Sequence, residues 1–279
     1  MSKILHTTLV AILLTSFNIT TWANSAETSY SFAVVPQQSA KRLAKLWSPV
    51  LHYLSEKTGV KLQFKTAKNI PEFEKRLAKG EYDFAYMNPY HFTVFNRSPG
   101  YNAVAVRQNQ PIRGIIVVRK DNPIQSLNEL SGKTLAFPSP AAFAASVLPR
   151  AHLSRSNIPF SSQYVSSHDS VYLNVAKGLF PAGGGVKRTF NNTNPEVKKQ
   201  LRILWTTEAY TPHAIAAHPR INGKILTKIQ NALVAMEKDP QGKSLLSTLK
   251  IKHGLIKATN SDWDDVTGLG IELLDQLVK

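Results

Sequence analysis

The first feature of the sequence that could bind a ligand is a Ser-Pro turn between a strand and an alanine-rich helix. Residues 133–137 (KTLAF) are apolar and partly β-branched, as in a buried strand, and Ser139 and Pro140 follow shortly after them. Serine is a preferred N-cap, and proline suits the first helical position because its fixed φ and missing N–H cost nothing there. The sequence therefore predicts a helix that begins at Ser139.

The predicted helix start could hold an anion. The residues after Pro140 are alanines interrupted only by Phe143, so the first free N–H groups of the helix are little covered by side chains. A helix N-terminus carries about half a positive charge together with unpaired donors, and both favour a bound anion. In the alternative interpretation, Ser139 caps its own helix and nothing binds.

A second group of polar side chains lies at and after a short apolar strand predicted at residues 84–87. Tyr86, Asn88, Tyr90 and His91 offer hydroxyl, amide and imidazole groups within six residues. Such groups suit the binding of a small polar molecule. Alternatively, Asn88 only opens a turn and the aromatic rings belong to the core or its rim.

The elements that would position these groups alternate between strands and helices. Strands predicted at residues 31–35, 60–64 and 84–87 are separated by helical patterns. This order is typical of a parallel sheet, in which ligands bind beyond the carboxyl ends of the strands. The loops at residues 37–39 and 88–91 would then lie at the same edge.

A second series of strands and helices begins after residue 123, following a strand predicted at residues 115–118 that leaves the first sheet, and this series favours a chain of two lobes. Further strands are predicted at residues 133–137, 163–165 and 201–205. The apolar stretch at residues 214–217 is expected to rejoin the first sheet. Loops and helix starts of both lobes would then face one cleft.

Three features of the later chain carry separate predictions. The glycines of AGGGVKRTF (residues 182–190) indicate a hinge-side turn or a close approach of backbone to a ligand. Lys187 or Arg188 could supply a cation to the cleft, or both could be solvated surface charges.

Two amphipathic C-terminal helices are predicted from apolar spacing. The spaced residues are Ile225, Ile229, Leu233 and Met236 in one helix, and Val266, Leu269, Leu273 and Leu277 in the other.

Composition limits the compartment and the class of partner. Residues 1–23 have the pattern of a secretory signal peptide cleaved after Ala23, and no later apolar run is long enough to span a membrane. The absence of cysteine excludes disulfides, thiolate metal sites and cysteine nucleophiles. The net charge is +16, but the sequence contains no run of basic residues. A protein that collects small anions is therefore favoured over one that binds nucleic acid.

The segments KTLAFPSPAAFAASVLP, YDFAYMNPYHF and SSHDSVYLNVAKG together resemble the phosphate, phosphite and phosphonate periplasmic binding proteins of ABC transporters. The resemblance implies an α/β chain with the two-lobed type II periplasmic binding fold and a ligand held between the lobes. Lobe 1 would comprise residues 25–116 and 214–279, and lobe 2 residues 117–213. Closure around the ligand would present a surface to a membrane permease.

The resemblance also implies a site. His168 matches a ligand-contacting histidine of the family, whereas three hydroxyl side chains that hold phosphonate oxygens in the family fall on Ala142, Phe143 and Ala144. Residues 179–182 lack the acid that binds the amine of aminoalkyl phosphonates, which disfavours a ligand with an ammonium group. The expected ligand is a small oxyanion, phosphonate-like or phosphate-like, with any apolar part against Phe143. The predicted ligand-binding residues are Tyr86, Asn88, Tyr90, His91, Ser139, Ala142, Phe143, Ala144, His168 and Arg188.

Other functions are weaker interpretations of the same residues. No catalytic motif is visible, so no enzyme activity and no cofactor are predicted. A metal site would need His91, His168, His213 and His218 to converge, and none is predicted. The chain is expected to be a monomer that serves a permease; reporting to a membrane sensor kinase, or binding an organic anion without phosphorus, remain alternatives.

Overall fold

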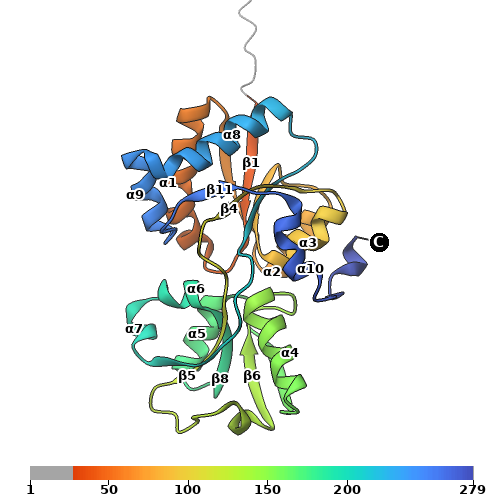
Figure 1. Cartoon of the computed structure of the whole chain (residues 1–279). Coiled ribbons are helices and arrows are strands. Elements are labelled where there is room, and N and C mark those ends of the chain that lie inside the picture. Colours follow the sequence, from red (N-terminus) through yellow and green to blue (C-terminus); the bar gives the residue numbers. More distant parts are fainter. Residues whose placement is uncertain (1–27, 279) are drawn as a thin grey trace, which may run out of the picture.

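The computed structural model describes residues 28–278 and contains two separate sheets. The strand order is β11-β4-β10-β3-β1-β2 in the six-stranded sheet and β7-β6-β8-β5-β9 in the five-stranded sheet. Figure 1 shows the two sheets in two lobes connected by two extended segments. These segments, near residues 110 and 210, pair through an antiparallel bridge between Ile112 and Tyr210. The predicted signal peptide lies outside the described residues.

The first sheet begins with the predicted parallel series. β1 (Ser29–Val34) pairs in parallel with β2 (Lys61–Lys65) and β3 (Phe84–Met87), and α1 (Ala40–Thr58) and α2 (Ile70–Ala78) lie between them in sequence. β10 (Ala214–Ala217) then pairs antiparallel with β3 and β4, as predicted for this apolar stretch. The lobe is completed by these elements: α3 (Pro89–Arg97), β4 (Asn102–Arg107), α8 (Gly223–Ala235), η3 (Met236–Lys238), α9 (Pro240–Thr248), β11 (Leu255–Lys257), η4 (Asn260–Trp263), α10 (Asp264–Thr267) and η5 (Asp275–Leu277).

The second sheet contains both parallel and antiparallel pairs. β6 (Lys133–Phe137) is parallel to β7 (Phe160–Tyr164) and β8 (Ala182–Val186), whereas β5 (Gly114–Arg119) is antiparallel to β8 and β9 (Leu201–Thr206). The expected lobe boundary at residues 116 and 117 falls inside β5, whose pairs all lie in this sheet. The other elements are η1 (Leu127–Leu130), η2 (Phe143–Val147), α4 (Leu148–Arg155), α5 (His168–Ala176), α6 (Lys187–Asn191) and α7 (Pro195–Lys198).

The predicted start of the alanine-rich helix is wrong. The helix begins at Phe143 with a π-helical segment, η2, and its N-cap is Ala142, which offers no side-chain cap. Residues 138–142 form an irregular turn, in which the Ser139 carbonyl accepts a hydrogen bond from Ala142 N at 3.4 Å. The Ala142 carbonyl accepts from the N–H groups of both Ser146 and Val147. Tertiary contacts of the turn therefore override the local capping preference of Ser139.

The glycine triplet is neither a turn nor a ligand wall but forms the middle of β8. A Cβ atom on Gly184 would lie 2.0 Å from the Ala145 carbonyl oxygen, and one on Gly185 would lie 2.3 Å from the Tyr172 hydroxyl. The glycines therefore do allow another part of the molecule to come close to the backbone of β8, as the sequence predicts. The parts that come close are η2 and α5, not a ligand. It brings β8 and the helix start to the same place between the lobes.

The second predicted C-terminal helix is also wrong. Leu269 and Leu273 lie between two short helical segments, α10 and η5, and only the first predicted helix is present, as α8. Gly270 has a left-handed φ of +60°, so α10 cannot continue through it as a regular helix. The apolar residues of this region pack onto the lobe 1 core as separate turns.

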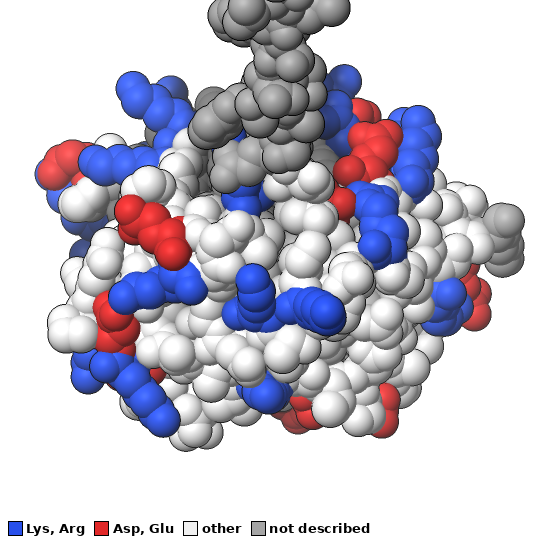
Figure 2. Space-filling model, turned by 90° about the horizontal axis from the view of Figure 1, so that it is seen from above, with Lys and Arg blue, Asp and Glu red and all other residues white. Residues whose placement is uncertain are grey.

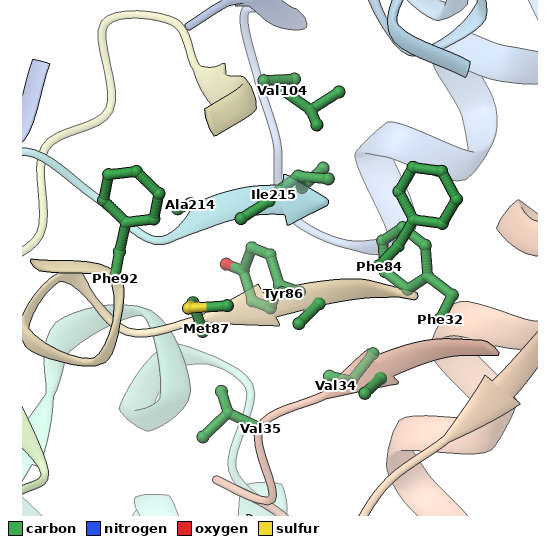
Figure 3. Packing of buried hydrophobic residues seen from close by; sticks show 14 of the residues in the cluster. Phe32, Val34, Val35, Phe84, Tyr86, Met87, Phe92, Val104, Ala214 and Ile215 are labelled. Carbon is green, nitrogen blue, oxygen red and sulfur yellow. The ribbon is translucent and has the colours of Figure 1, made fainter. Parts of the chain in front are cut away.

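The core of lobe 1 is built on its sheet, and the surface above it carries charges of both signs. Figure 3 shows Phe32, Phe84, Tyr86 and Ile215 packed between β1, β3 and β10, and all four are at most 4% exposed. On the face seen in Figure 2, basic side chains are scattered among acidic ones and do not form one continuous patch. The mixture of charges on this face agrees with a sequence that has no run of basic residues.

Candidate functional site

A small cavity lies where the two lobes meet. Its volume is about 10 Å³, close to the roughly 10–15 Å³ that one water molecule needs. Lobe 1 contributes the ends of its strands and the loops that follow them, and lobe 2 contributes η2, the start of α5 and the end of β8. The lining residues are Val35, Gln37, Ile70, Asn88, Ile112, Ala142, Phe143, Ala144, Ala145, His168, Val186 and His213. The cavity is therefore a closed inter-lobe site with room for a very small group.

Free backbone donors line one side of the cavity. Within the described chain, no group accepts a hydrogen bond from the N–H of Phe143, Ala144 or Ala145. These residues open a continuous helical segment formed by η2 and α4. Unpaired N–H groups and the helix dipole both favour an anion at such a point.

A chain of hydrogen bonds orients His213 toward the cavity. Arg188 Nη2 donates to Gln37 Oε1 at 2.8 Å, which leaves Gln37 Nε2 to donate to His213 Nε2, also at 2.8 Å. A neutral imidazole that accepts at Nε2 carries its proton at Nδ1. His213 Nδ1 is buried and has no partner among the described residues, so it is a free donor.

His168 presents a second unpaired nitrogen. Its Nδ1 lies 3.0 Å from Thr189 Oγ1, whereas its Nε2 is buried without a partner in the described chain. Thr189 Oγ1 and the Tyr172 hydroxyl can each donate to the Val186 carbonyl. When Tyr172 donates there, Thr189 can donate to His168 Nδ1, and His168 Nε2 then carries a proton toward the cavity. An oxyanion would select this tautomer.

Both imidazoles are neutral at physiological pH. Burial, with a smaller contribution from the Arg188 charge, lowers the pKa of His168 to about 3. Burial lowers the pKa of His213 well below its ordinary value, and the charges of Arg188 and Arg107 add to the shift. The site can therefore offer neutral N–H donors to an anion, with guanidinium charge nearby.

The structure brings only some of the predicted site residues to the cavity. Ala142, Phe143, Ala144, His168 and Asn88 line it. Asn88 is also the N-cap of α3, where its Oδ1 accepts from His91 N at 2.7 Å, and its Nδ2 donates across the lobes to the Ala141 carbonyl at 3.3 Å.

The other predicted residues lie behind the cavity or beside it. Tyr86 stacks on His213 with ring centroids 4.9 Å apart, and Ser139 is buried with no hydrogen-bond partner for its hydroxyl among residues 28–278. Arg188 does not line the cavity but donates a hydrogen bond to Gln37, which does. Arg188 itself lines a neighbouring groove.

Tyr90 and His91 are directed elsewhere in lobe 1. The Tyr90 hydroxyl accepts a hydrogen bond from Leu274 N at 2.9 Å, and His91 Nε2 lies 2.8 Å from Glu74 Oε1. Neither residue lines the cavity. Their placement follows from α3, because residues of one helical turn cannot all point to the same side.

Gln37 and His213 are the polar lining residues that were not among the predicted site residues. Gln37 belongs to a loop whose position at the sheet edge was predicted, but amides are too common to single out. His213 precedes β10, which returns to lobe 1, so only the topology shows that it meets Gln37. Within residues 28–278 no His, Cys, Asp and Glu groups form a metal site, and none of the helices there has the length and apolar character needed to cross a bilayer.

Comparison with known proteins agrees with this architecture. Residues 32–263 match the family described as ABC transporter, phosphonate, periplasmic substrate-binding protein. The phosphate-import protein PhnD of Mycolicibacterium smegmatis is 21% identical, covering 89% of this chain and 88% of that protein.

Two solved structures have the same fold. PhnD1 of Prochlorococcus marinus, in complex with methylphosphonate, has a TM-score of 0.79 at 18% identity and covers 87% of this chain and 97% of its own. A binding protein component of an ABC phosphonate transporter from Pseudomonas aeruginosa has a TM-score of 0.80 at 15% identity, covering 90% and 88% respectively.

The two lobes, each built on its own sheet, define the type II periplasmic binding fold. The chain belongs to the phosphonate family of ABC transporter periplasmic substrate-binding proteins. This confirms the resemblance seen in the sequence. The family consists of binding components of transport systems.

Proposed function

We propose that the chain captures a small phosphorus oxyanion in the inter-lobe cavity and delivers it, as a monomer in the periplasm, to a membrane permease. The observation that carries this proposal is the convergence of unpaired donors on one cavity. Three N–H groups at the start of η2, His213 Nδ1 and His168 Nε2 all come from residues that line it. Anionic oxygens are the acceptors that such a set binds best.

The apolar part of the cavity wall limits the class of ligand. Val35, Ile70, Ile112 and Val186 line the cavity together with Phe143, and no Asp or Glu of the described chain does. A phosphonate with a small alkyl group would place its oxygens at the donors and its apolar group on this wall. An ammonium group would find no carboxylate, which disfavours aminoalkyl phosphonates. The names of the relatives, a phosphate importer and a protein with bound methylphosphonate, support the same class.

Binding requires the lobes to separate. The cavity is about 10 Å³ and its polar lining residues are at most 5% exposed, so a ligand cannot enter the closed form. Cross-lobe hydrogen bonds hold this form: Gln37 O accepts from His168 N at 2.9 Å, and Asp169 accepts from Gln38 and Ser39. Opening breaks these bonds, and a bound oxyanion would replace their contribution on closure.

A thermal-shift screen with phosphate, phosphite, methylphosphonate and sulfate tests the proposal. Ligand at 100 times its dissociation constant stabilises the folded state by about 2.7 kcal/mol. We expect a shift with at least one phosphorus oxyanion, confirmed by calorimetric titration. If none of the phosphorus compounds shifts the transition or gives heat of binding, the proposal is wrong.

A further inference from the structure

A groove beside the cavity carries positive charge from both lobes. Its volume is about 420 Å³, and Ile112 and Val186 belong to both its wall and the wall of the cavity. No Asp or Glu among the described residues lines the groove, whereas these Lys and Arg residues do: Arg107, Arg113, Lys187, Arg188, Lys250 and Lys252. A concave surface with this charge attracts anions.

Arg107 is the least expected member of the groove. It is the last residue of β4 and is only 5% exposed, yet its guanidinium makes no hydrogen bond or ion pair with any described residue. Burial lowers the pKa of this guanidinium, and the nearby charge of Arg188 adds to the shift. A buried charge without a partner is costly, so the fold retains a group that a bound anion would pair.

Arg188 faces the same groove from the other lobe. Its Nη2 donates to Gln37, but its Nε is buried and has no partner in the described part of the chain. Arg107 belongs to the first sheet, whereas Arg188 belongs to α6, which follows β8 of the second sheet, so their repulsion opposes closure of the lobes. An anion between them would turn this repulsion into attraction.

Two hydrogen bonds between loops fix one wall of the groove. Gln110 Nε2 donates to the Lys250 carbonyl at 3.1 Å, and Lys252 N donates to Gln110 Oε1 at 2.6 Å. These bonds fix the loop after β4 to the loop before β11. The basic side chains of lobe 1 are therefore presented from a fixed backbone, which reduces the ordering cost of binding.

We propose that the groove is a second anion site, specific for a polyphosphate, and that its occupant pairs Arg107 and Arg188 across the two lobes. Guanidinium groups match phosphate oxygens in geometry, and six cations favour a multivalent anion over a single phosphate. The groove is larger than the cavity, and the proposal does not depend on which oxyanion the cavity binds.

Calorimetric titration with inorganic pyrophosphate tests the proposal. We expect Arg107→Met to weaken binding at least about tenfold, because hydrogen bonds to charged groups are lost. Arg155→Met is the matched control: it removes an exposed arginine of α4 outside the groove and should leave the affinity unchanged. Failure of the wild-type protein to bind pyrophosphate at low salt, or equal affinity in Arg107→Met, would overturn the proposal.

A crossed comparison separates the groove from the cavity. His213→Ala should weaken binding of methylphosphonate and leave binding of pyrophosphate intact, and Arg107→Met should do the reverse. If His213→Ala abolishes pyrophosphate binding while Arg107→Met retains it, the pyrophosphate occupies the cavity and the groove is not an anion site. If the wild-type protein binds pyrophosphate but none of phosphate, phosphite and methylphosphonate, the proposed function is wrong and the groove proposal stands.

Thermal unfolding gives a readout that a purely structural arginine would not. Without ligand, Arg107→Met should raise the Tm, because an unpaired buried charge is removed, and it should abolish the Tm shift caused by pyrophosphate. A lower Tm with an undiminished pyrophosphate shift would contradict the proposal. If Arg107→Met does not fold, the double variant Lys250→Gln, Lys252→Gln changes only exposed side chains and should still weaken pyrophosphate binding; unchanged binding there would also overturn the proposal.

Discussion

At the scale of single residues, hydrogen-bond partners determine which atoms of the cavity can bind a ligand. The Gln37 amide is fixed by Arg188 on one side, and His213 is therefore left with its proton on Nδ1. His168 has a hydroxyl partner on one nitrogen only. Both histidines are neutral because burial opposes their charged form. They can donate to an anion but do not add charge to attract one.

Removal of the His213 donor should weaken ligand binding strongly. A hydrogen bond to a charged group contributes about 1.5–3 kcal/mol, so we expect His213→Ala to lower the affinity for the bound oxyanion roughly 10- to 150-fold. His52→Ala is the control, because His52 is exposed and its ion-pair partner is Glu56 on the same helix. Titration calorimetry measures both. An affinity of His213→Ala equal to that of the control would remove His213 from the site.

The neutral histidines should also make stability depend on pH. Their pKa values are lower in the folded state than the ordinary value near 6.5, so below that pH the unfolded chain binds more protons than the folded chain. The stability is complete above pH 6.5 and falls as the pH is lowered toward 3. We expect the free energy of unfolding to fall by about 1.4 kcal/mol per pH unit for each histidine at the steepest part.

Urea unfolding between pH 7 and 5, above the ordinary titration of carboxylates, measures this slope. His168→Asn should reduce the slope by the contribution of one group. An equal slope in the variant would show that His168 is not held neutral by the fold. His52→Asn provides the comparison, because His52 is exposed.

At the scale of elements, close packing of glycine backbone positions the helix start. β8 can approach η2 because Gly184 has no side chain, and a Cβ atom there would lie 2.0 Å from the Ala145 carbonyl oxygen. Gly114 on β5 has the same relation to the Ala144 carbonyl oxygen. Both strands therefore pack closely against η2, whose first three N–H groups, those of Phe143, Ala144 and Ala145, have no acceptor among the described residues.

Gly184→Ala should therefore damage both stability and binding. The added methyl group must displace β8 or η2, and such overpacking costs about 1–3 kcal/mol. Gly223→Ala, in α8, is the matched control: nothing lies within 4 Å of its Cβ position, so no loss is expected. Chemical denaturation and titration with the oxyanion report the two effects. A Gly184→Ala protein as stable as wild type would show that the contact is not tight.

At the scale of the whole molecule, closure of two lobes is what forms the cavity. Residues of both lobes line it. Its polar lining residues are at most 5% exposed, so a ligand has no path to the cavity in this closed form. The two segments between the lobes run side by side through the Ile112–Tyr210 bridge (Figure 1). Such paired connections permit the lobes to rotate as rigid bodies.

Small-angle X-ray scattering should detect this opening. We expect a larger radius of gyration without ligand than with a saturating oxyanion, because the ligand stabilises the closed form. Gln37→Ala removes the link between Arg188 and His213 and should shift the ligand-bound protein toward the open form. Identical scattering with and without a ligand shown to bind by calorimetry would contradict closure.

The sequence by itself determined the family and part of the element order. Short apolar runs placed β3 and β6 with their observed bounds, and the alternation of strands and helices indicated the parallel pairing of β1, β2 and β3. The same local patterns failed at Ser139 and at residues 266–277. At both places the local helix preference, from a capping serine or from apolar spacing, contributes about 1 kcal/mol or less per residue. Tertiary packing outweighs a preference of this size.

Only the tertiary structure decided which polar groups face the cavity. Tyr90 and His91 offer polar groups suited to a ligand in the sequence, but they contact Leu274 N and Glu74 instead. Gln37 and His213 had no sequence signal that set them apart. The orphan charge of Arg107 is likewise invisible in the sequence. Local propensity depends on neighbours along the chain, but a free donor is defined by the absence of partners in space, and 176 residues separate Gln37 from His213.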